Sequence, residues 1–102
     1  MTTLHIDLVL EPDHAEPLVR AFQQSFVPAV SIQEGFRSVR LLAPADGESN
    51  YRISLEFETE ELRQKWVASQ EHGPAWDAIV ESIASFSTAL FDEVGTGNGD
   101  AQ

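Results

Sequence analysis

The sequence predicts an α+β domain of the ferredoxin-like type, a split β-α-β repeat that forms a four-stranded antiparallel sheet. Three observations support this fold class. Apolar residues alternate with polar ones in short segments, two longer stretches repeat apolar residues at helical spacing, and the order is strand, helix, strand, strand, broken helix, strand. A chain of 102 residues provides one core, with both helical segments on the same face of the sheet.

The first strand and the first helix occupy the N-terminal third of the chain. Apolar residues with a period of two predict a half-buried strand: Leu4, Ile6, Leu8 and Leu10. Asp13 is expected to cap a helix, with Glu16 three positions on completing a capping box. Pro28 should kink or end that helix, which leaves open whether residues 29–33 continue it. Gly35 is the expected C-terminal cap.

The middle of the chain predicts a β-hairpin. Phe36–Leu42 and Tyr51–Phe57 are expected to be strands, because apolar and β-branched residues alternate in both. The turn chemistry between them comes from four residues: Pro44, Asp46, Gly47 and Asn50.

The C-terminal half predicts a broken helix and a last strand. Thr59 should cap the helix, Leu62 and Trp66 should face the sheet, and His72-Gly73-Pro74 should interrupt it. The apolar stripe of the second piece is expected to be Trp76, Ile79, Val80 and Ile83. Residues 86–94 should form the fourth strand. Residues 1–94 are thus one domain, and the glycine-rich segment 95–102 is expected to be a disordered tail.

Composition excludes several classes of function. The chain has 17 acidic residues against 6 Lys and Arg, a formal charge of −11, which disfavours nucleic acids and anionic membranes as partners. It has no cysteine, so disulfides, thiolate catalysis and zinc–thiolate sites are excluded. No targeting signal or long apolar stretch is evident, which favours a cytoplasmic protein.

The second face of the predicted sheet carries a mixed polar set: His5, Asp7, Val9, Arg52, Ser54 and Glu56. Such a face can remain in water. It can also close against a second copy of the chain, with Asp7 or Glu56 paired to Arg52.

Three segments resemble the antibiotic biosynthesis monooxygenase superfamily: Glu34-Gly35-Phe36, the strand 51–57, and the helix start 59–69. The resemblance implies a homodimeric α+β barrel that oxidises a small aromatic or quinone-like molecule without a bound cofactor. Trp66 also matches the haem-degrading branch of the superfamily. That branch needs a histidine ten positions later and an asparagine on the first strand, where this chain has Trp76 and Ile6.

An oxygenase without a cofactor needs a base, an anion-stabilising group and an aromatic pocket. His72 is the candidate base, and Arg40 the candidate anion-binding group if its strand points it into the cleft. The candidate pocket residues are Trp66, Trp76, Phe22, Phe26 and Phe36.

Each of these candidates also has a structural interpretation. His72 can be a surface residue, the two tryptophans core residues, and Arg40 an exposed edge or interface residue. No metal site is expected, because the acidic run at Glu56, Glu58, Glu60 and Glu61 is better explained as a solvated strand end and helix start.

Three functions therefore remain open. The chain can be a cofactor-independent monooxygenase or a non-catalytic dimeric barrel that binds a small apolar molecule. It can also be an isomerase-like relative that uses His72 or a carboxylate for proton transfer.

Overall fold

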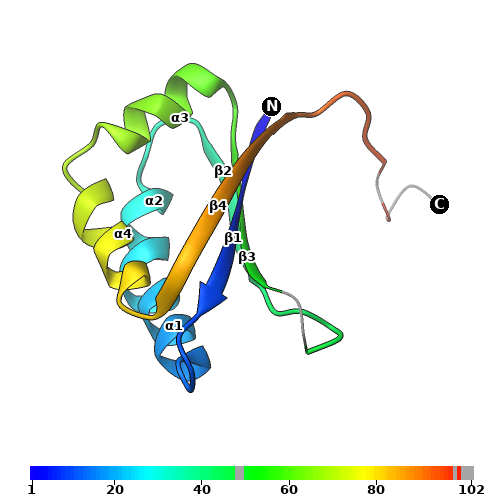
Figure 1. The fold of residues 1–102 in the computed structure, drawn as a ribbon. Helices are drawn as coiled ribbons and strands as arrows, with labels where there is room; N and C mark the ends of the chain where they lie inside the picture. Colours follow the sequence, from blue (N-terminus) through cyan, green and yellow to red (C-terminus); the bar gives the residue numbers. More distant parts are fainter. Residues whose placement is uncertain (48–49, 98, 100–102) are drawn as a thin grey trace.

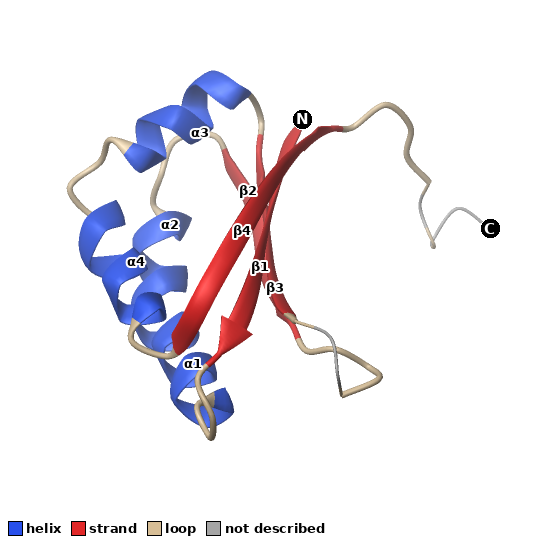
Figure 2. Cartoon of the chain, in the orientation of Figure 1, coloured by secondary structure: helices blue, strands red, loops and turns tan. Residues whose placement is uncertain are grey.

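The computed structural model describes residues 1–47, 50–97 and 99, and it has two layers. The strands are β1 (Thr2–Leu10), β2 (Phe36–Leu42), β3 (Tyr51–Phe57) and β4 (Ile83–Asp92). The helices are α1 (Ala15–Ala21), the π-helical turn η1 (Phe22–Phe26), α2 (Val27–Ser31), α3 (Glu60–Val67) and α4 (His72–Val80). The strands form one antiparallel sheet in the order β2-β3-β1-β4, and all helices lie on one face of it (Figures 1 and 2). This confirms the predicted ferredoxin-like fold.

The register of the sheet places the apolar residues beneath the helices, as the period of two predicts. In the central pair, Ile6 lies opposite Ile53 and Leu4 lies opposite Leu55. The buried strand residues form one core with the helices, and they are Ile6, Leu8, Ile53, Leu55 and Phe57. The helices cover only this face, so the opposite face of the sheet is open (Figure 1).

The first helix begins differently from the prediction. Asp13 does not cap it: its φ is +62°, and the helix starts at Ala15 without a side-chain cap. His14 is the residue before the helix, and its Nδ1 donates to the carbonyl oxygen of Pro12 at 2.8 Å. The tight turn after Pro12 therefore takes the place of the expected capping box.

Pro28 does not end the helical segment. The wide π-helical turn η1 precedes it, and Pro28 sits in the first turn of α2, where a missing N–H costs no hydrogen bond. Helical structure then continues to Ser31, which answers the question left open for residues 29–33.

The break in the second helical segment lies at residues 68–71, earlier than predicted. His72 is the first residue of α4, and Pro74 is its third, still within the first turn. Two stripe residues were also predicted wrongly: Val80 is 42% exposed, and Ile83 is the buried first residue of β4. The helix ends sooner because the backbone carbonyl oxygen of Ser82 accepts a hydrogen bond from the N–H of Glu11, the residue after β1, at 3.0 Å.

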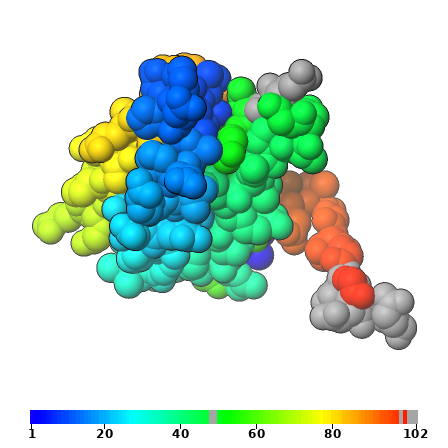
Figure 3. Space-filling model, turned by 90° about the horizontal axis from the view of Figure 1, so that it is seen from below, coloured from blue at the N-terminus to red at the C-terminus, as the bar shows by residue number. Residues whose placement is uncertain are grey.

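The chain end after β4 contains no helix or strand at residues 93–97 and 99. In the space-filling view this segment extends away from the packed body (Figure 3). The remaining positions of the predicted tail, 98 and 100–102, lie outside the described residues. Among the described helices, none is long and apolar enough to span a membrane.

Gly35 joins the helical layer to β2 at a position that only glycine fits. Its φ is +81°, and a Cβ there would lie 2.9 Å from the Cβ of Leu62 on α3. Its carbonyl oxygen accepts from the N–H of Glu58 at 2.8 Å, which ties the start of β2 to the end of β3. The prediction of Gly35 as the C-terminal cap was wrong, because α2 ends at Ser31 and its cap residue is Ile32. The glycine is instead required where Leu62 of α3 packs against the chain just before β2.

We expect Gly35→Ala to lower the free energy of unfolding by about 3 kcal/mol, from left-handed strain plus the collision with Leu62. Gly47→Ala is the matched control, because Gly47 has a φ of +74° but nothing within 4 Å of the place where the added methyl group would stand. Gly47→Ala should lower the free energy of unfolding by about 1 kcal/mol. Urea unfolding of both variants measures the difference, and equal losses would show that the Leu62 contact contributes nothing.

Candidate functional site

A cavity of about 260 Å³ lies between the helices and the β1–β4 side of the sheet. It forms here because β4 is an edge strand that pairs only with β1, and its helix-facing side chains stay exposed. The cavity is lined by Leu4, Ile6, Arg63, Val67, His72, Trp76, Phe86, Thr88 and Leu90.

His72 enters the cavity from the first position of α4, and its ring packs against Trp66. The two ring centroids are 4.9 Å apart in an edge-on arrangement. Trp66 is only 2% exposed, and on another side it meets Phe26 of η1 at 5.8 Å, again edge-on. The imidazole is therefore positioned by a tryptophan that is itself locked into the core.

The environment of His72 favours its neutral form. Burial is the largest influence that lowers the pKa of His72, and the nearby Arg63 guanidinium lowers it further, while Asp77 opposes them. The lowered pKa leaves the imidazole unprotonated at neutral pH. It can then accept a proton from a bound molecule.

Arg63 is the charged group of the cavity, and Glu60 holds it in place. The Arg63 Nε and Nη2 donate to the two carboxylate oxygens of Glu60, each at 2.7 Å. The Arg63 side chain is only 14% exposed. The same hydrogen bonds lower the pKa of Glu60 to about 2, so the pair remains ionised at neutral pH.

The sequence reasoning missed Arg63, although a signal was present. Arg63 precedes Trp66 by three residues, so the two side chains lie on neighbouring positions of the same helical face. A buried tryptophan at 66 therefore places the guanidinium near the sheet.

The walls of the cavity are aromatic and aliphatic. The Trp76 and Phe86 rings meet edge-on with centroids 4.9 Å apart, which joins α4 to β4. Thr88 and Leu90 follow Phe86 on the same side of β4. The β4 residues were missed because the prediction gave no face assignment for the last strand.

Of the predicted site residues, the structure brings only His72 and Trp76 to the cavity wall. Trp66 lies behind His72. Phe22 and Phe26 stack on each other in the core at 5.9 Å, and Phe36 packs edge-on against Phe57 at 6.1 Å.

Arg40 lies on the opposite face of the sheet, exposed and paired in register with Ser54. The reason is a register shift between Phe36 and Ser38. Without it Arg40 would share the helix-facing side of Phe36, whereas the bulge moves Arg40 to the open face.

The acidic run is divided among separate partners. Glu56 accepts a hydrogen bond from Ser38 at 2.6 Å, Glu58 pairs with Arg37 at 3.7 Å, and Glu60 holds Arg63. Across residues 1–47, 50–97 and 99, no three His, Asp or Glu side chains gather closely enough to hold a metal ion.

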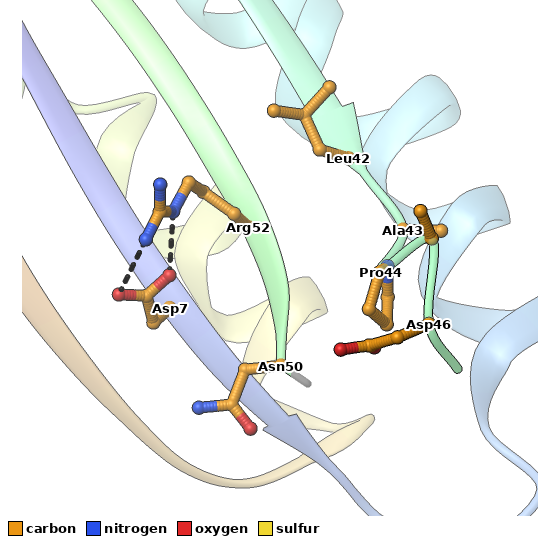
Figure 4. Close-up of a pocket in the computed structure, with 8 residues that line it drawn as sticks. Asp7, Leu42, Ala43, Pro44, Asp46, Asn50 and Arg52 are labelled. Carbon is orange, nitrogen blue, oxygen red and sulfur yellow. Dashed lines mark hydrogen bonds and ion pairs between the residues drawn. The ribbon is translucent and has the colours of Figure 1, made fainter. Parts of the chain in front are cut away.

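A second, larger depression of about 510 Å³ lies on the open face near the β2–β3 loop (Figure 4). Its charged pair is Asp7 and Arg52, joined at 2.7 Å between neighbouring strands. The sequence left Asp7 and Glu56 open as partners of Arg52 in a sheet closed against a second copy, and here the pair with Asp7 forms within one chain. We assign the candidate site to the helix-side cavity instead, because its lining combines a histidine and an arginine with aromatic and aliphatic walls, whereas the open-face depression has no histidine and no aromatic side chain.

Comparison with known structures gives the same fold. SnoaB, a cofactor-independent oxygenase from Streptomyces nogalater, superimposes with a TM-score of 0.81 at 17% identity, over 93% of this chain and 94% of that one. A mutant of MhuD with two manganese protoporphyrin IX molecules per active site gives 0.79 at 24% identity, over 97% and 100%. Rv0793 from Mycobacterium tuberculosis gives 0.77 at 13% identity, over 95% and 98%.

The amino-acid sequence itself identifies the protein family. No curated protein matches the chain. The family model described as antibiotic biosynthesis monooxygenase matches residues 1–79, which include β1, the whole hairpin, Arg63, His72 and Trp76. The chain therefore belongs to the antibiotic biosynthesis monooxygenase family.

Proposed function

We propose that this protein is a cofactor-independent monooxygenase that acts on a small aromatic or quinol-like molecule in the helix-side cavity. The observation that carries the proposal is that an imidazole, His72, and a guanidinium, Arg63, line the same mostly apolar cavity. A base and a cation placed together favour formation of a substrate anion.

In the proposed reaction His72 acts as the base, and the anion that forms lies beside Arg63. His72 takes a proton from the substrate, and the resulting electron-rich carbanion or phenolate reacts with molecular oxygen. One oxygen atom enters the product and the other leaves as water, with all electrons supplied by the substrate. For naphthalene-1,4-diol the balanced reaction with O₂ gives 2-hydroxy-1,4-naphthoquinone and one water.

The structural relatives include both kinds of protein, and the lining of this cavity favours the oxygenase over haem degradation. SnoaB is a cofactor-independent oxygenase, whereas MhuD binds manganese protoporphyrin. In this chain Ile6 and Trp76, which stand where the haem-degrading branch has polar groups, both line the cavity. The cavity of about 260 Å³ is also smaller than most ligand sites, which typically have about 300–1,000 Å³.

A non-catalytic binding protein is the second candidate. Six of the nine lining residues are apolar, which suits retention of an apolar molecule without reaction. The oxygen experiment below separates the two functions, because a binding protein consumes no oxygen.

We also propose that the chain forms a homodimer through the open face of the sheet. Three large apolar side chains are partly exposed there: Val9 at 40%, Leu42 at 41% and Phe91 at 51%. Phe91 packs against His5 with ring centroids 5.0 Å apart. A second copy would cover these side chains and the Asp7–Arg52 pair.

We expect His72→Gln to reduce turnover of naphthalene-1,4-diol about 100-fold or more, because general-base catalysis typically contributes about 10²–10⁴. Oxygen uptake, with product identified by mass spectrometry, measures the loss. The enzymatic product is the hydroxyquinone, whereas uncatalysed oxidation gives 1,4-naphthoquinone. His14→Gln is the matched control and should keep wild-type turnover, since His14 lies at the start of α1. Unchanged turnover in His72→Gln would remove His72 as the base.

The titration of His72 gives an independent test. Because the pKa of His72 is lowered, its NMR titration midpoint should lie below 6.5, and the rate should fall only as the pH drops through that lower value. Asp77→Asn should move the midpoint further down, since Asp77 raises this pKa. A midpoint at or above 6.5 in the wild-type protein would contradict the neutral imidazole.

For the homodimer, native mass spectrometry should give twice 11.3 kDa. Phe91→Glu should shift the protein to monomer, because a carboxylate would be buried in the interface. Ile32→Glu is the matched control on the helical layer, where Ile32 is 73% exposed, and should leave the dimer intact. A monomeric wild-type protein would contradict the homodimer and leave the open face in contact with solvent.

A further inference from the structure

The unused hydrogen-bonding edge of Arg63 indicates what the cavity binds. A guanidinium has five N–H donors, and Glu60 takes one from Nε and one from Nη2. Within the described part of the chain no hydrogen bond uses Arg63 Nη1, and no buried side-chain nitrogen lacks a partner. Nη1 is therefore accessible, and it is the part of the guanidinium that Glu60 leaves available to donate to a bound oxygen.

The charges around the cavity are arranged asymmetrically. Of the described residues that line it, Arg63 is the only charged one besides the titratable His72, which is neutral at pH 7. Glu60 instead lines a neighbouring cavity of about 260 Å³ with Thr2, Leu90, Phe91 and Asp92. The carboxylate thus orients the guanidinium from outside. In a chain with a net charge of −11, a cavity lined by a cation and no carboxylate is selective for a negative or strongly accepting oxygen.

The other lining residues determine the size and polarity of the molecule that the cavity can hold. The aromatic pair Trp76 and Phe86 and the aliphatic side chains of Leu4, Ile6 and Leu90 offer an apolar space of about 260 Å³. This volume fits one or two fused rings. The acidic hydrogen of such a ligand would face His72, and its oxygen would face Arg63.

We infer that Arg63 determines the specificity of the cavity: its Nη1 edge selects small planar aromatic compounds that bind as oxyanions over their neutral counterparts. The inference deepens the proposed function by naming the ligand class, and it rests on the same cavity. It assigns to Arg63 the anion-binding role for which Arg40 is on the wrong face. Glu60 is the positioning residue that holds the guanidinium.

Calorimetric titration of the full chain at neutral pH tests this with two probes that differ by one oxygen atom. 2-Hydroxy-1,4-naphthoquinone is ionised at neutral pH, and 1,4-naphthoquinone is neutral. The chain has no cysteine, so thiol addition to the quinones does not interfere. The wild-type protein should bind the hydroxyquinone at least about tenfold more tightly, the value of one charge-assisted hydrogen bond.

Arg63→Met should abolish that preference while changing the affinity for 1,4-naphthoquinone less than about threefold. Arg20→Met is the matched control, because it removes the same charge from an exposed position on α1 and should keep the preference. If Arg63→Met fails to fold by circular dichroism, Arg63→Gln replaces it, and the wild-type comparison decides without any variant.

Equal affinities of the wild-type protein for both probes, binding of neither, or equal weakening by Arg63→Met and Arg20→Met would each overturn the inference. Binding is measured without oxygen chemistry, so the two proposals fail separately. Selectivity for the hydroxyquinone without oxygen uptake on the diol keeps the ligand class and rejects the oxygenase. Turnover without selectivity rejects only the role of Arg63.

Discussion

Trp66 is packed between Phe26 of the π-helical turn and His72 of α4, and this packing connects η1, α3 and α4. The indole is almost fully buried, so it fixes α3 against the core. The same burial brings Arg63, one turn earlier on α3, to the cavity and seats the first residue of α4 beside it. The base and the cation of the candidate site thus owe their positions to one core residue.

The sheet was predictable from the sequence because strand periodicity is local. Ile6 and Ile53 both follow an alternating pattern, and their facing positions in the sheet follow from two patterns meeting in register. The sequence left two acidic partners open for Arg52, Asp7 and Glu56, and the register of β1 with β3 places Asp7 opposite it. The order of the strand-like and helix-like segments predicted the topology, and Gly35 sets how closely α3 approaches the start of β2.

The candidate site was harder to predict, because it depends on features that no local pattern records. A single bulge between Phe36 and Ser38 reverses the face of Arg40, and it carries no clear sequence signature. The helix boundary at Val80 depends on a hydrogen bond between Ser82 and the distant Glu11. His72 and Trp76 could be identified, whereas the part played by β4 required the edge position of that strand.

The exposure of β4 bears on how such a protein acquires new specificities. After the buried Ile83, every residue of the strand through Asp92 is exposed, and the strand is held mainly by its backbone pairing with β1. Phe86, Thr88 and Leu90 nevertheless form one wall of the cavity. Substitutions at these three positions would reshape the ligand space while removing little buried core, so selection for a new ligand can act here without first having to restore a damaged fold.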